Sequence, residues 1–448
     1  MTVQPLRDFF ATGRTRPFAW RATQLEALLR LISENEDTLV DAIVADLGRE
    51  RSEAWLGDLA AVIAEARYAR THLRRWMRPE RAHVPLILQP GRAFTQFEPL
   101  GVVLVIAPWN YPIHLALAPL VGALAGGNCA VLKPSELAPK SSAVLAELVP
   151  RYLDPHAVAV VEGDAATTTA LIAEGFDHCF FTGSPAVGRI IMRAAAEHLT
   201  PVTLELGGKS PAIVAEDADL DAAAARIAFG KTMASGQTCV APDYVLAHRA
   251  IRDELAAKIV TALGKFTDGG TLPIVNQRHL DRLGGLIASA NGKVITGGAG
   301  AEDGELRLRP TVILDPDADS QLMREEIFGP VLPILTVDSV YAAIEYVRRG
   351  EKPLAAYLFT KKRAYRKRVL AEVSSGGLVH NQVMEHLFVP GIPFGGVGNS
   401  GMGAYHGRIG FETFSHRKAV LSRPSWPARQ LYYPPIKDAV LKLTRRLL

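Results

Sequence analysis

Residues 99–133 read PLGVVLVIAPWNYPIHLALAPLVGALAGGNCAVLK, a stretch in which the final lysine is the first Lys, Arg, Asp or Glu. Three prolines and a glycine pair interrupt it, so an unbroken membrane-spanning helix of about 20 residues does not fit. A buried strand at 101–107, a helix at 113–125 and a second buried strand at 128–133 explain the pattern better. Strand, helix and strand in succession build a parallel sheet.

The same alternation continues along the chain. The next predicted elements are a helix at 141–151, a strand at 156–161, a helix at 165–174, a strand at 179–183, a helix at 187–197 and a strand at 201–206. A second group comprises helices at 219–233, 250–263 and 279–290 and strands at 293–296 and 311–314. Helices are expected over 18–75, and a hairpin over 81–99. The fold class is therefore α/β, with two doubly wound domains.

Composition excludes several classes of protein. Hydrophobic residues make up 48% and charged residues 21%, which is typical of a globular chain and not of a disordered one. A net charge of +4 is too weak to indicate nucleic-acid binding. Three cysteines argue against a disulfide framework, and MTVQPLRDFF lacks the apolar segment of a secretory signal. We expect a reducing, cytoplasmic location.

Two segments carry candidate catalytic groups. SGQTCVAP places Cys239 in a glycine-flanked loop of small residues, where a nucleophile is accessible. Cys129 and Cys179 lie in apolar strands and are expected in the core. LELGGKSP places Glu205 at the end of an apolar strand. There it is either a structural salt-bridge partner or a general base with a raised pKa.

Other segments suit a nucleotide. FTGSPAVG runs from a strand into a glycine turn and a helix, and presents N–H groups to a phosphate; only Gly183 and Gly188 fit a dinucleotide fingerprint, so a plain turn remains an alternative. VLKPSE places Lys133 and Glu136 after a strand, where they suit a ribose or form a solvated turn. Asn110 also follows a strand, as an amide donor or a turn residue.

Two motifs complete the set: EEIFGP at 325–330 and the glycine-rich PFGGVGNSG at 393–401. No His, Cys and Asp cluster has metal-ligand spacing, so no metal is predicted.

Taken in this order, the motifs resemble those of the aldehyde dehydrogenase superfamily over roughly residues 15–435. The chain length and the block PFGGVGNSGMGAYHGRIGFETFSHRK at 393–418 resemble the class 3 branch, which includes fatty and aromatic aldehyde dehydrogenases. The resemblance implies two doubly wound parallel-sheet domains and a small bridging β-element. The implied parts are a dinucleotide-binding domain at 1–81 and 99–207, a catalytic domain at 208–410, a bridging element at 82–98 and 411–430, and a basic amphipathic tail at 431–448.

The implied reaction is NAD(P)-dependent oxidation of a medium or long aliphatic or an aromatic aldehyde to the carboxylic acid. In the family the residue matching Cys239 is the nucleophile, and it forms a thiohemiacetal and then a thioester. Glu205 matches the general base for hydrolysis, and Asn110 matches the oxyanion donor. Because Cys239 and Glu205 are both retained, a catalytically silent protein and a coenzyme A-acylating dehydrogenase are the less favoured alternatives.

The cofactor implied is NAD, with NADP as the second choice. The residues that match its site are Trp109, Lys133, Glu136, Gly183, Ser184, Val187, Glu326 and Phe328. Those that match the substrate funnel are Tyr111, Leu115, Phe229, Thr238 and His406, with Trp55 near the entrance. A carboxylate at the ribose favours NAD in general, but class 3 relatives use both cofactors, so Glu136 leaves the choice open.

The implied partner is a second copy of the chain, in a homodimer paired through β-arms. The tail has an apolar face with cations around it. The apolar face holds Ile436, Val440, Leu443 and Leu447, and the cations are Lys437, Lys442, Arg445 and Arg446. We expect this helix to pack on its own subunit or on the dimer partner. Weak, salt-sensitive contact with an anionic membrane is the second hypothesis.

Overall fold

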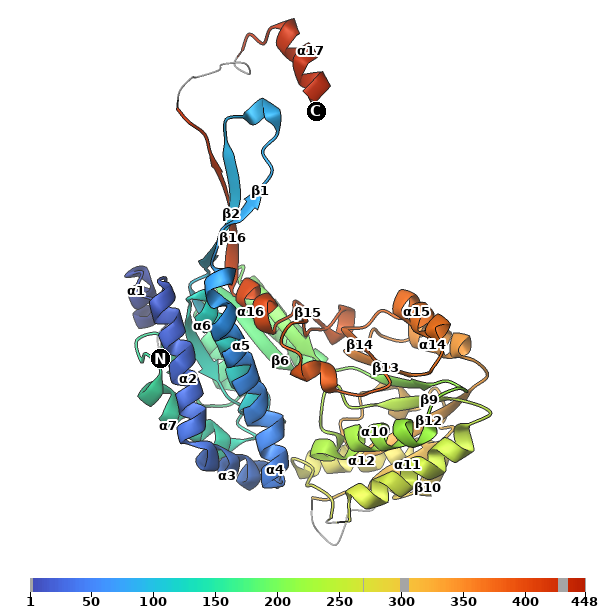
Figure 1. Ribbon diagram of the computed structural model, residues 1–448. Coiled ribbons are helices and arrows are strands. Elements are labelled where there is room, and N and C mark those ends of the chain that lie inside the picture. Colours follow the sequence, from blue (N-terminus) through green and yellow to red (C-terminus); the bar gives the residue numbers. More distant parts are fainter. Residues whose placement is uncertain (1–2, 269, 299–305, 426–433, 448) are drawn as a thin grey trace.

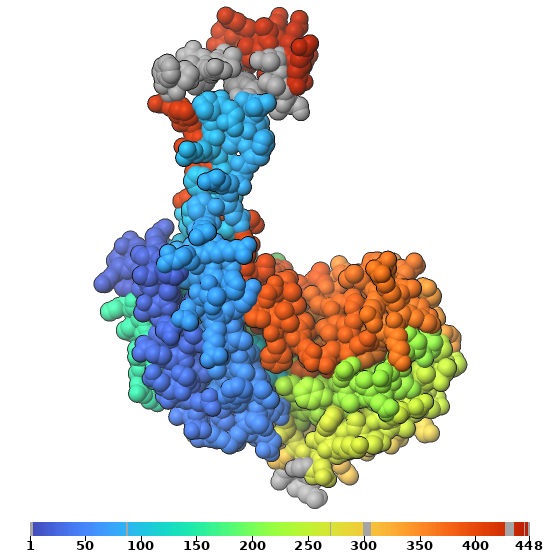
Figure 2. Space-filling model, viewed as in Figure 1, coloured from blue at the N-terminus to red at the C-terminus, as the bar shows by residue number. Residues whose placement is uncertain are grey.

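Two α/β lobes stand side by side, and a thin arm rises from the first (Figures 1 and 2). The computed structural model describes residues 3–268, 270–298, 306–425 and 434–447. The largest apolar cluster includes residues of both lobes, such as Val103, Leu120 and Val245. The lobes are therefore joined by a shared core.

The first lobe is built on a six-stranded sheet with the order β15-β7-β6-β3-β4-β5. Its strands are β3 (Val102–Ile106), β4 (Cys129–Lys133), β5 (Val158–Val160), β6 (His178–Gly183), β7 (Val202–Leu206) and β15 (Gly401–Met402). Neighbouring strands are parallel, except that β15 runs antiparallel to β7. β3 and β4 are buried throughout, because helices cover both faces of a parallel sheet.

The helices of the first lobe follow the predicted positions closely, except the first, which was not predicted. They are α1 (Gln4–Ala11), α2 (Phe18–Glu34), α3 (Glu36–Leu47), α4 (Arg51–Ala54), the π-helix η1 (Trp55–Leu59), α5 (Ala60–Trp76), α6 (His114–Gly126), α7 (Pro139–Tyr152), α8 (Ala165–Ala173) and α9 (Pro185–Ala196). α6 is apolar on every side and is buried along its length. Gly122 lets α16 (Gly407–Thr413) pack closely, because a Cβ there would lie 3.0 Å from the Gly410 oxygen.

The second lobe is built on a seven-stranded sheet with the order β10-β11-β12-β9-β8-β13-β14. Its strands are β8 (Pro211–Val214), β9 (Tyr244–His248), β10 (Lys293–Thr296), β11 (Thr311–Leu314), β12 (Val331–Val337), β13 (Ala355–Phe359) and β14 (Gly377–His380). All neighbours are parallel except β10 with β11.

Helices also flank the second sheet. They are α10 (Leu220–Thr232), α11 (Arg252–Phe266), α12 (Gln277–Ala288), α13 (Gln321–Arg324), α14 (Val340–Arg349) and α15 (Arg363–Glu372). Short 3-10 turns are η2 (Leu86–Leu88), η3 (Met233–Gly236), η4 (Glu385–Phe388) and η5 (Gly398–Ser400). The Asp219 carboxylate accepts the Ala222 N–H at 3.1 Å and caps α10.

The arm is a three-stranded antiparallel sheet with the order β1-β2-β16. Its strands are β1 (Glu80–Ala82), β2 (Arg92–Pro99) and β16 (Ser415–Ser422). Helix α17 (Asp438–Leu447) lies beyond the tip, next to η2 (Figure 1). Residues 426–433, which fall in the predicted bridging element and tail, and the side chains of Leu443 and Leu447 lie outside the described residues.

No helix within the described ranges is both long enough and apolar enough to cross a lipid bilayer.

Candidate active site

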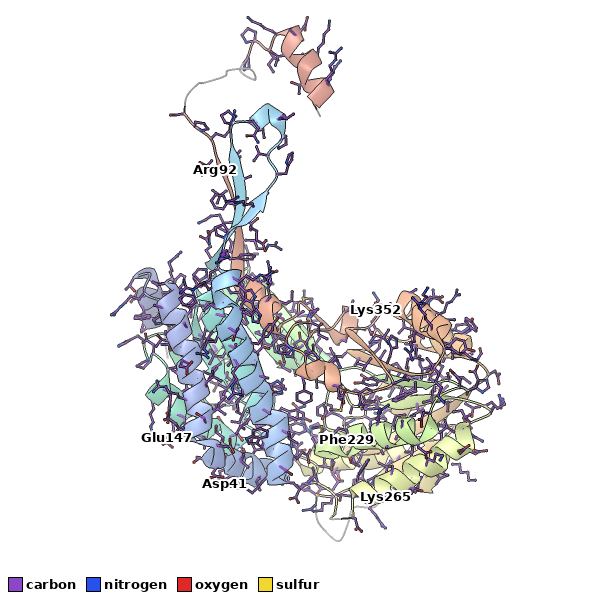
Figure 3. The ribbon with its side chains drawn as sticks, in the orientation of Figure 1. Asp41, Arg92, Glu147, Phe229, Lys265 and Lys352 are labelled. Atoms are coloured by element: carbon purple, nitrogen blue, oxygen red, sulfur yellow. The ribbon has the colours of Figure 1, made fainter. Side chains whose placement is uncertain are left out.

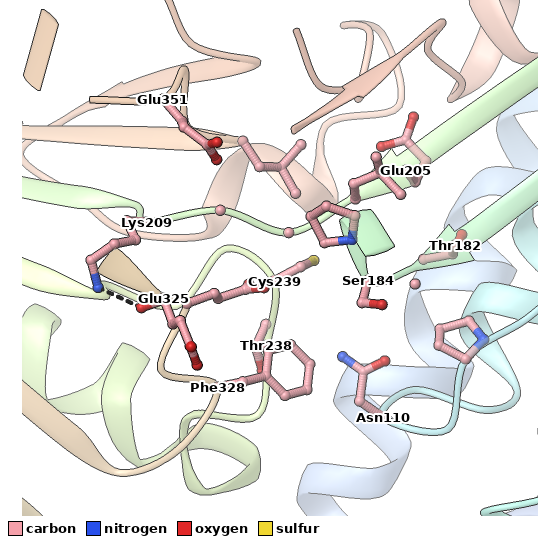
Figure 4. A pocket seen from close by; sticks show the side chains of 18 of the residues that line it. Asn110, Thr182, Ser184, Glu205, Lys209, Thr238, Cys239, Glu325, Phe328 and Glu351 are labelled. Carbon is pink, nitrogen blue, oxygen red and sulfur yellow. Dashed lines mark hydrogen bonds between the residues drawn. The ribbon is translucent and has the colours of Figure 1, made fainter. Parts of the chain in front are cut away.

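A cavity of about 1020 Å³ lies between the two lobes, at the carboxyl ends of β3, β6 and β7. Ligands of open α/β sheets bind at this edge. Most of the predicted site residues line it (Figure 4). Those brought together are Trp109, Asn110, Tyr111, Leu115, Gly183, Ser184, Glu205, Thr238, Cys239, Glu326 and Phe328.

Cys239 lies in the loop between η3 and β9, and its side chain is half-buried. Three residues in succession before the loop have left-handed backbone, at φ 49° for Ala234, 52° for Ser235 and 69° for Gly236. This sharp turn brings the loop to the cavity. Burial, together with the charges of Glu326 and Glu205, raises the pKa of the Cys239 thiol to about 12.

Glu205 stands at the end of β7 and is 3% exposed. Neither carboxyl oxygen has a hydrogen-bond partner among the residues that the structure describes. Burial raises the pKa of Glu205 well above its ordinary value. A carboxyl left in this state at a cavity wall suits proton transfer, and no described Lys or Arg forms a salt bridge with it.

Asn110 follows β3 in the loop that leads to α6. Its Nδ2 donates to the Gln237 backbone oxygen at 3.0 Å, and its own backbone oxygen accepts from Arg49. The amide group is buried, and it lines the cavity with Cys239 and Glu205 (Figure 4). Asn110 therefore ties the β3–α6 loop to the Cys239 loop.

The predicted cofactor residues that line the cavity lie in three places: after β3, at the junction of β6 and α9, and in the segment before β12. Ser184 follows β6 and caps α9, because its Oγ accepts the Val187 N–H at 3.3 Å. Phe328 has φ 50° and packs edge-on against Trp109, with ring centroids 5.6 Å apart. Burial, and secondarily the Asp243 charge, raise the pKa of Glu326 to about 8.

Five predicted residues are not part of the cavity wall. Lys133 and Glu136 form an ion pair at 2.9 Å beyond β4, with Lys133 buried and Glu136 exposed. Val187 is exposed on the first turn of α9, and Phe229 is 49% exposed on α10 at the edge facing the first lobe (Figure 3). His406 lies behind the wall. Their contacts with cofactor or substrate stay predictions.

His406 is buried, and its ring stacks on Phe394 at 5.4 Å and meets Tyr405 edge-on at 4.4 Å. Phe394 and Tyr405 themselves line the cavity, so His406 supports two wall residues. Burial lowers the pKa of His406 to about 3, which keeps its ring neutral at physiological pH. Trp55, predicted near the entrance, lies in η1 and not in the wall.

Charged residues that the sequence motifs do not identify hold the segment around Glu326 in place. Lys209 pairs with Asp243 and donates to the backbone oxygens of Leu322 at 2.9 Å and Glu325 at 2.8 Å (Figure 4 shows the last of these). Asp243 accepts the Ile327 N–H at 2.9 Å. The Arg282 guanidinium donates to the backbone oxygens of Glu326 and Ile327. Lys209 lies in the motif LELGGKSP, but its partners are more than thirty residues away.

Known proteins are similar to this chain in sequence and in fold. Residues 4–420 match the model of the aldehyde dehydrogenase family. The chain is 46% identical over 444 residues to aldehyde dehydrogenase family 3 member B1 of Bos taurus, covering 97% of this chain and 94% of that protein. It is also 46% identical to the dimeric NADP-preferring aldehyde dehydrogenase of Rattus norvegicus, with 97% of each covered.

Solved structures agree. The substrate-bound AldH of Staphylococcus aureus superimposes with a TM-score of 0.95 at 39% identity, covering 99% of this chain and 98% of that one. A Mycobacterium tuberculosis aldehyde dehydrogenase complexed with NAD+ gives 0.85 at 30% identity, covering 95% and 90%. The chain therefore belongs to the aldehyde dehydrogenase family, in its family 3 branch, and catalyses the NAD(P)-dependent oxidation of an aldehyde.

Proposed function

We propose that this enzyme oxidises medium or long aliphatic or aromatic aldehydes to free carboxylic acids, with Cys239 as nucleophile, Asn110 as oxyanion donor and Glu205 as general base. One observation carries the proposal. Three chemically matched groups from three separate segments share one cavity wall, and the carboxyl among them is buried with no hydrogen-bond partner among the described residues. Such a group costs stability and is retained where chemistry needs it.

In the first step the Cys239 Sγ, as thiolate, forms a bond to the aldehyde carbon, and the carbonyl oxygen becomes an oxyanion. The Asn110 Nδ2 and the Cys239 backbone N–H donate to that oxygen. In other enzymes the loss of one such donor costs about 2.7–4 kcal/mol. Because burial keeps the thiol protonated, its proton must pass to a nearby acceptor before attack.

NAD(P) held in this site would supply the hydride acceptor; once the carbon bonded to Sγ loses its hydride, Cys239 would carry the acyl group as a thioester. Glu205, in its ionised form, then takes a proton from water, and the hydroxide adds to the thioester carbon. The bond from carbon to Sγ breaks, the acid leaves and the thiolate returns. Burial raises the pKa of this carboxyl, so its ionised form is a stronger base for this proton transfer. The retention of Glu205 favours hydrolysis over transfer to coenzyme A.

The residues present fit a dinucleotide. The N-terminus of α9, entered through Gly183 and Ser184, presents N–H groups to a pyrophosphate. Gly207 leaves room for the Glu326 carboxylate, which any Cβ at that position would overlap. Glu326 would hold the nicotinamide ribose, and Trp109 and Phe328 would pack near the nicotinamide ring. Lys133 and Glu136 would bind the adenine ribose.

The proposed substrate class follows from the rest of the wall. The side chains near Asn110 and Cys239 are mostly aromatic or aliphatic, and they bury apolar surface of a substrate. They are Tyr111, Leu115, Met384, Leu387, Phe388 and Phe394. Thr238 adds a hydroxyl that is already paired with Tyr111 at 2.9 Å.

The proposed assembly is a homodimer in the cytoplasm. The arm projects away from both lobes and carries exposed apolar side chains, with Leu86 75% and Leu421 55% exposed. An exposed strand edge of this kind pairs readily with a second copy. The rat relative is named as dimeric. Light scattering of the full chain and of one lacking residues 83–91 tests this: the deletion should give a monomer.

Weak contact of α17 with an anionic membrane is the second hypothesis for the tail helix. It is tested by co-sedimentation of the protein with vesicles at low and high salt.

The central experiment measures absorbance at 340 nm with a panel of aldehydes and each cofactor. Cys239→Ala should reduce kcat to the background rate, because no other group can form the thioester. Cys179→Ala is the matched control, since Cys179 is buried in β6 away from the cavity and should leave kcat unchanged. Substantial turnover by Cys239→Ala would contradict the assignment, and a preference for short polar aldehydes would contradict the substrate class.

A further inference from the structure

A buried ion pair lies behind the wall that carries Asn110. Arg49 follows α3, and Asp58 lies in the π-helix η1. Arg49 Nη1 and Asp58 Oδ2 are 3.0 Å apart, and the two side chains are 2% and 0% exposed. Burying two charges carries a desolvation penalty that apolar residues would avoid. The pair therefore contributes little as a source of stability, and its contacts indicate another use.

Both members of the pair bind the backbone of one short segment. Arg49 Nη2 donates to the Asn110 backbone oxygen. Asp58 Oδ1 accepts the N–H groups of Ile113 and His114, each at 3.0 Å. The pair thus holds the loop from β3 into α6 at its middle, through Asn110, and at the start of α6.

The pair also holds Tyr111. The Arg49 guanidinium lies 4.2 Å from the centre of the Tyr111 ring. Gly57 also borders the Tyr111 ring, and a Cβ there would lie 2.8 Å from a ring carbon, so only glycine leaves space for the ring. Gly57 and Asp58 are brought to these places by η1, and π-turns inside helices often occur at functional sites.

The held segment contacts the Cys239 loop directly. Asn110 Nδ2 donates to the Gln237 oxygen at 3.0 Å, and the Tyr111 hydroxyl pairs with Thr238 Oγ1 at 2.9 Å. These two contacts are made with the two residues immediately before Cys239. A shift of the β3–α6 loop would therefore move the Asn110 amide and the Cys239 loop relative to each other.

We propose that Arg49 and Asp58 are positioning residues that hold Asn110 and Tyr111 in register with Cys239. The inference rests on the proposed role of Asn110 as oxyanion donor. The contacts of the two side chains go to the protein, so their loss should lower kcat and leave the KM for NAD unchanged. Misplacement of a reacting group by about 1 Å costs on the order of 100-fold in rate.

The first test compares two variants with a control. Arg49→Lys keeps the charge but loses the forked donor and its planar contact with Tyr111. Arg49→Met with Asp58→Asn removes both charges and leaves an acceptor for Ile113 and His114. We expect kcat to fall at least about tenfold in both. Arg151→Met, which breaks an exposed pair with Glu147, should be neutral.

The second test asks whether Arg49 acts through Asn110. Arg49→Lys is introduced into Asn110→Ala, which keeps the backbone oxygen and removes only the amide. If the arginine positions that amide, its substitution should now change kcat by less than about twofold. An equal loss of kcat in both backgrounds would overturn the proposal. Wild-type kcat in Asn110→Ala alone would instead overturn the proposed oxyanion role.

Amide hydrogen exchange tests the positioning role of Arg49 and Asp58 independently of activity. In the doubly substituted variant, peptides over residues 107–118 should exchange at least tenfold faster, because the loop and the start of α6 lose their anchor. Peptides over β9 should keep their rates. Unchanged exchange over 107–118, faster exchange everywhere, or failure of both variants to fold would each overturn a positioning role.

Discussion

The two sides of the cavity differ in the partners that they give to a buried carboxyl group. Glu205, on the first lobe, is 3% exposed, and neither oxygen has a hydrogen-bond partner among the described residues. Asp243, behind the second-lobe wall, is also 3% exposed, but its oxygens bind Lys209 and the Ile327 N–H. A saturated carboxylate stabilises the fold, whereas an unpartnered one destabilises it and remains free to exchange protons.

The largest effect should come from Glu205→Gln, which removes the proton acceptor and keeps the shape. Steady-state kcat should fall by about 10²–10⁴. The first-turnover burst of reduced cofactor should survive, because deacylation needs the base more than hydride transfer does. Stopped-flow and steady-state absorbance at 340 nm measure both. The free energy of unfolding should not fall, since no hydrogen bond is lost.

A burst that disappears together with steady-state turnover would contradict this prediction and place Glu205 in acylation. A large loss of stability would mean that Glu205 resembles Asp243 after all.

Asp243→Asn should mainly lower stability and cofactor binding, in contrast to Glu205→Gln, which should mainly lower kcat. The amide keeps an acceptor for the Ile327 N–H but leaves Lys209 without its counter-charge. We expect about 3 kcal/mol loss of unfolding free energy, at the low end for a broken buried pair, because Lys209 keeps two carbonyl acceptors. The KM for NAD should rise because the Glu326 segment loosens. Urea denaturation and cofactor titration measure the two effects, and unchanged stability would contradict the contrast.

Carboxyl groups on both sides of the cavity influence the pKa of Cys239. The titration of its thiol therefore compares the effects of the two sides directly. The pKa of its thiol, about 12, is raised first by burial, then by the charge of Glu326, then by that of Glu205. Removal of either charge should therefore move the alkylation of Cys239 by iodoacetamide to lower pH. The shift should be larger for Glu326→Gln than for Glu205→Gln. Rates measured between pH 7 and 11 without cofactor test this, and equal profiles in all three proteins would contradict it.

The first sheet was predictable from the sequence, and the second only in part. The helices and strands between residues 101 and 206 agree with the predicted ranges, because short apolar strands alternate there with longer helices. Five strands of the second sheet, β8, β9, β12, β13 and β14, were not predicted. Pro333 lies inside β12 and argues against a central strand. It is tolerated where it pairs with Ile313 in a parallel ladder.

Residues of the site were predictable where a local motif carried them, as with Cys239, Glu205 and Asn110. Lys209, Arg282 and Asp243 were not, because each acts on a segment far away in the sequence. The π-helix η1 was also missed, since AWLGDLAA reads as an ordinary helix. What distinguishes it is the contact of Asp58 with Arg49 and the β3–α6 loop, which only the tertiary structure supplies.

The smallest effect is expected in the arm, where charges are paired but exposed. Lys418 on β16 pairs with Glu98 on β2, with side chains 50% and 26% exposed, and this contact lowers the pKa of Glu98. Solvent screens such pairs, so Lys418→Met should lower the free energy of unfolding by less than about 1 kcal/mol and leave kcat unchanged. Because the pKa of Glu98 is lowered in the folded state, its ionised carboxylate stabilises the fold at pH values above the ordinary pKa of glutamate. This stabilisation is lost as the carboxyl becomes protonated at lower pH. The difference from the wild type should therefore vanish as pH falls below about 4.3. Denaturation at fixed protein concentration, at pH 7 and at acid pH, measures it. If Lys418→Met lowers the free energy of unfolding as much as Asp243→Asn does, the exposed pair in the arm stabilises the fold as much as the buried pair beside the cavity. That result would contradict the prediction.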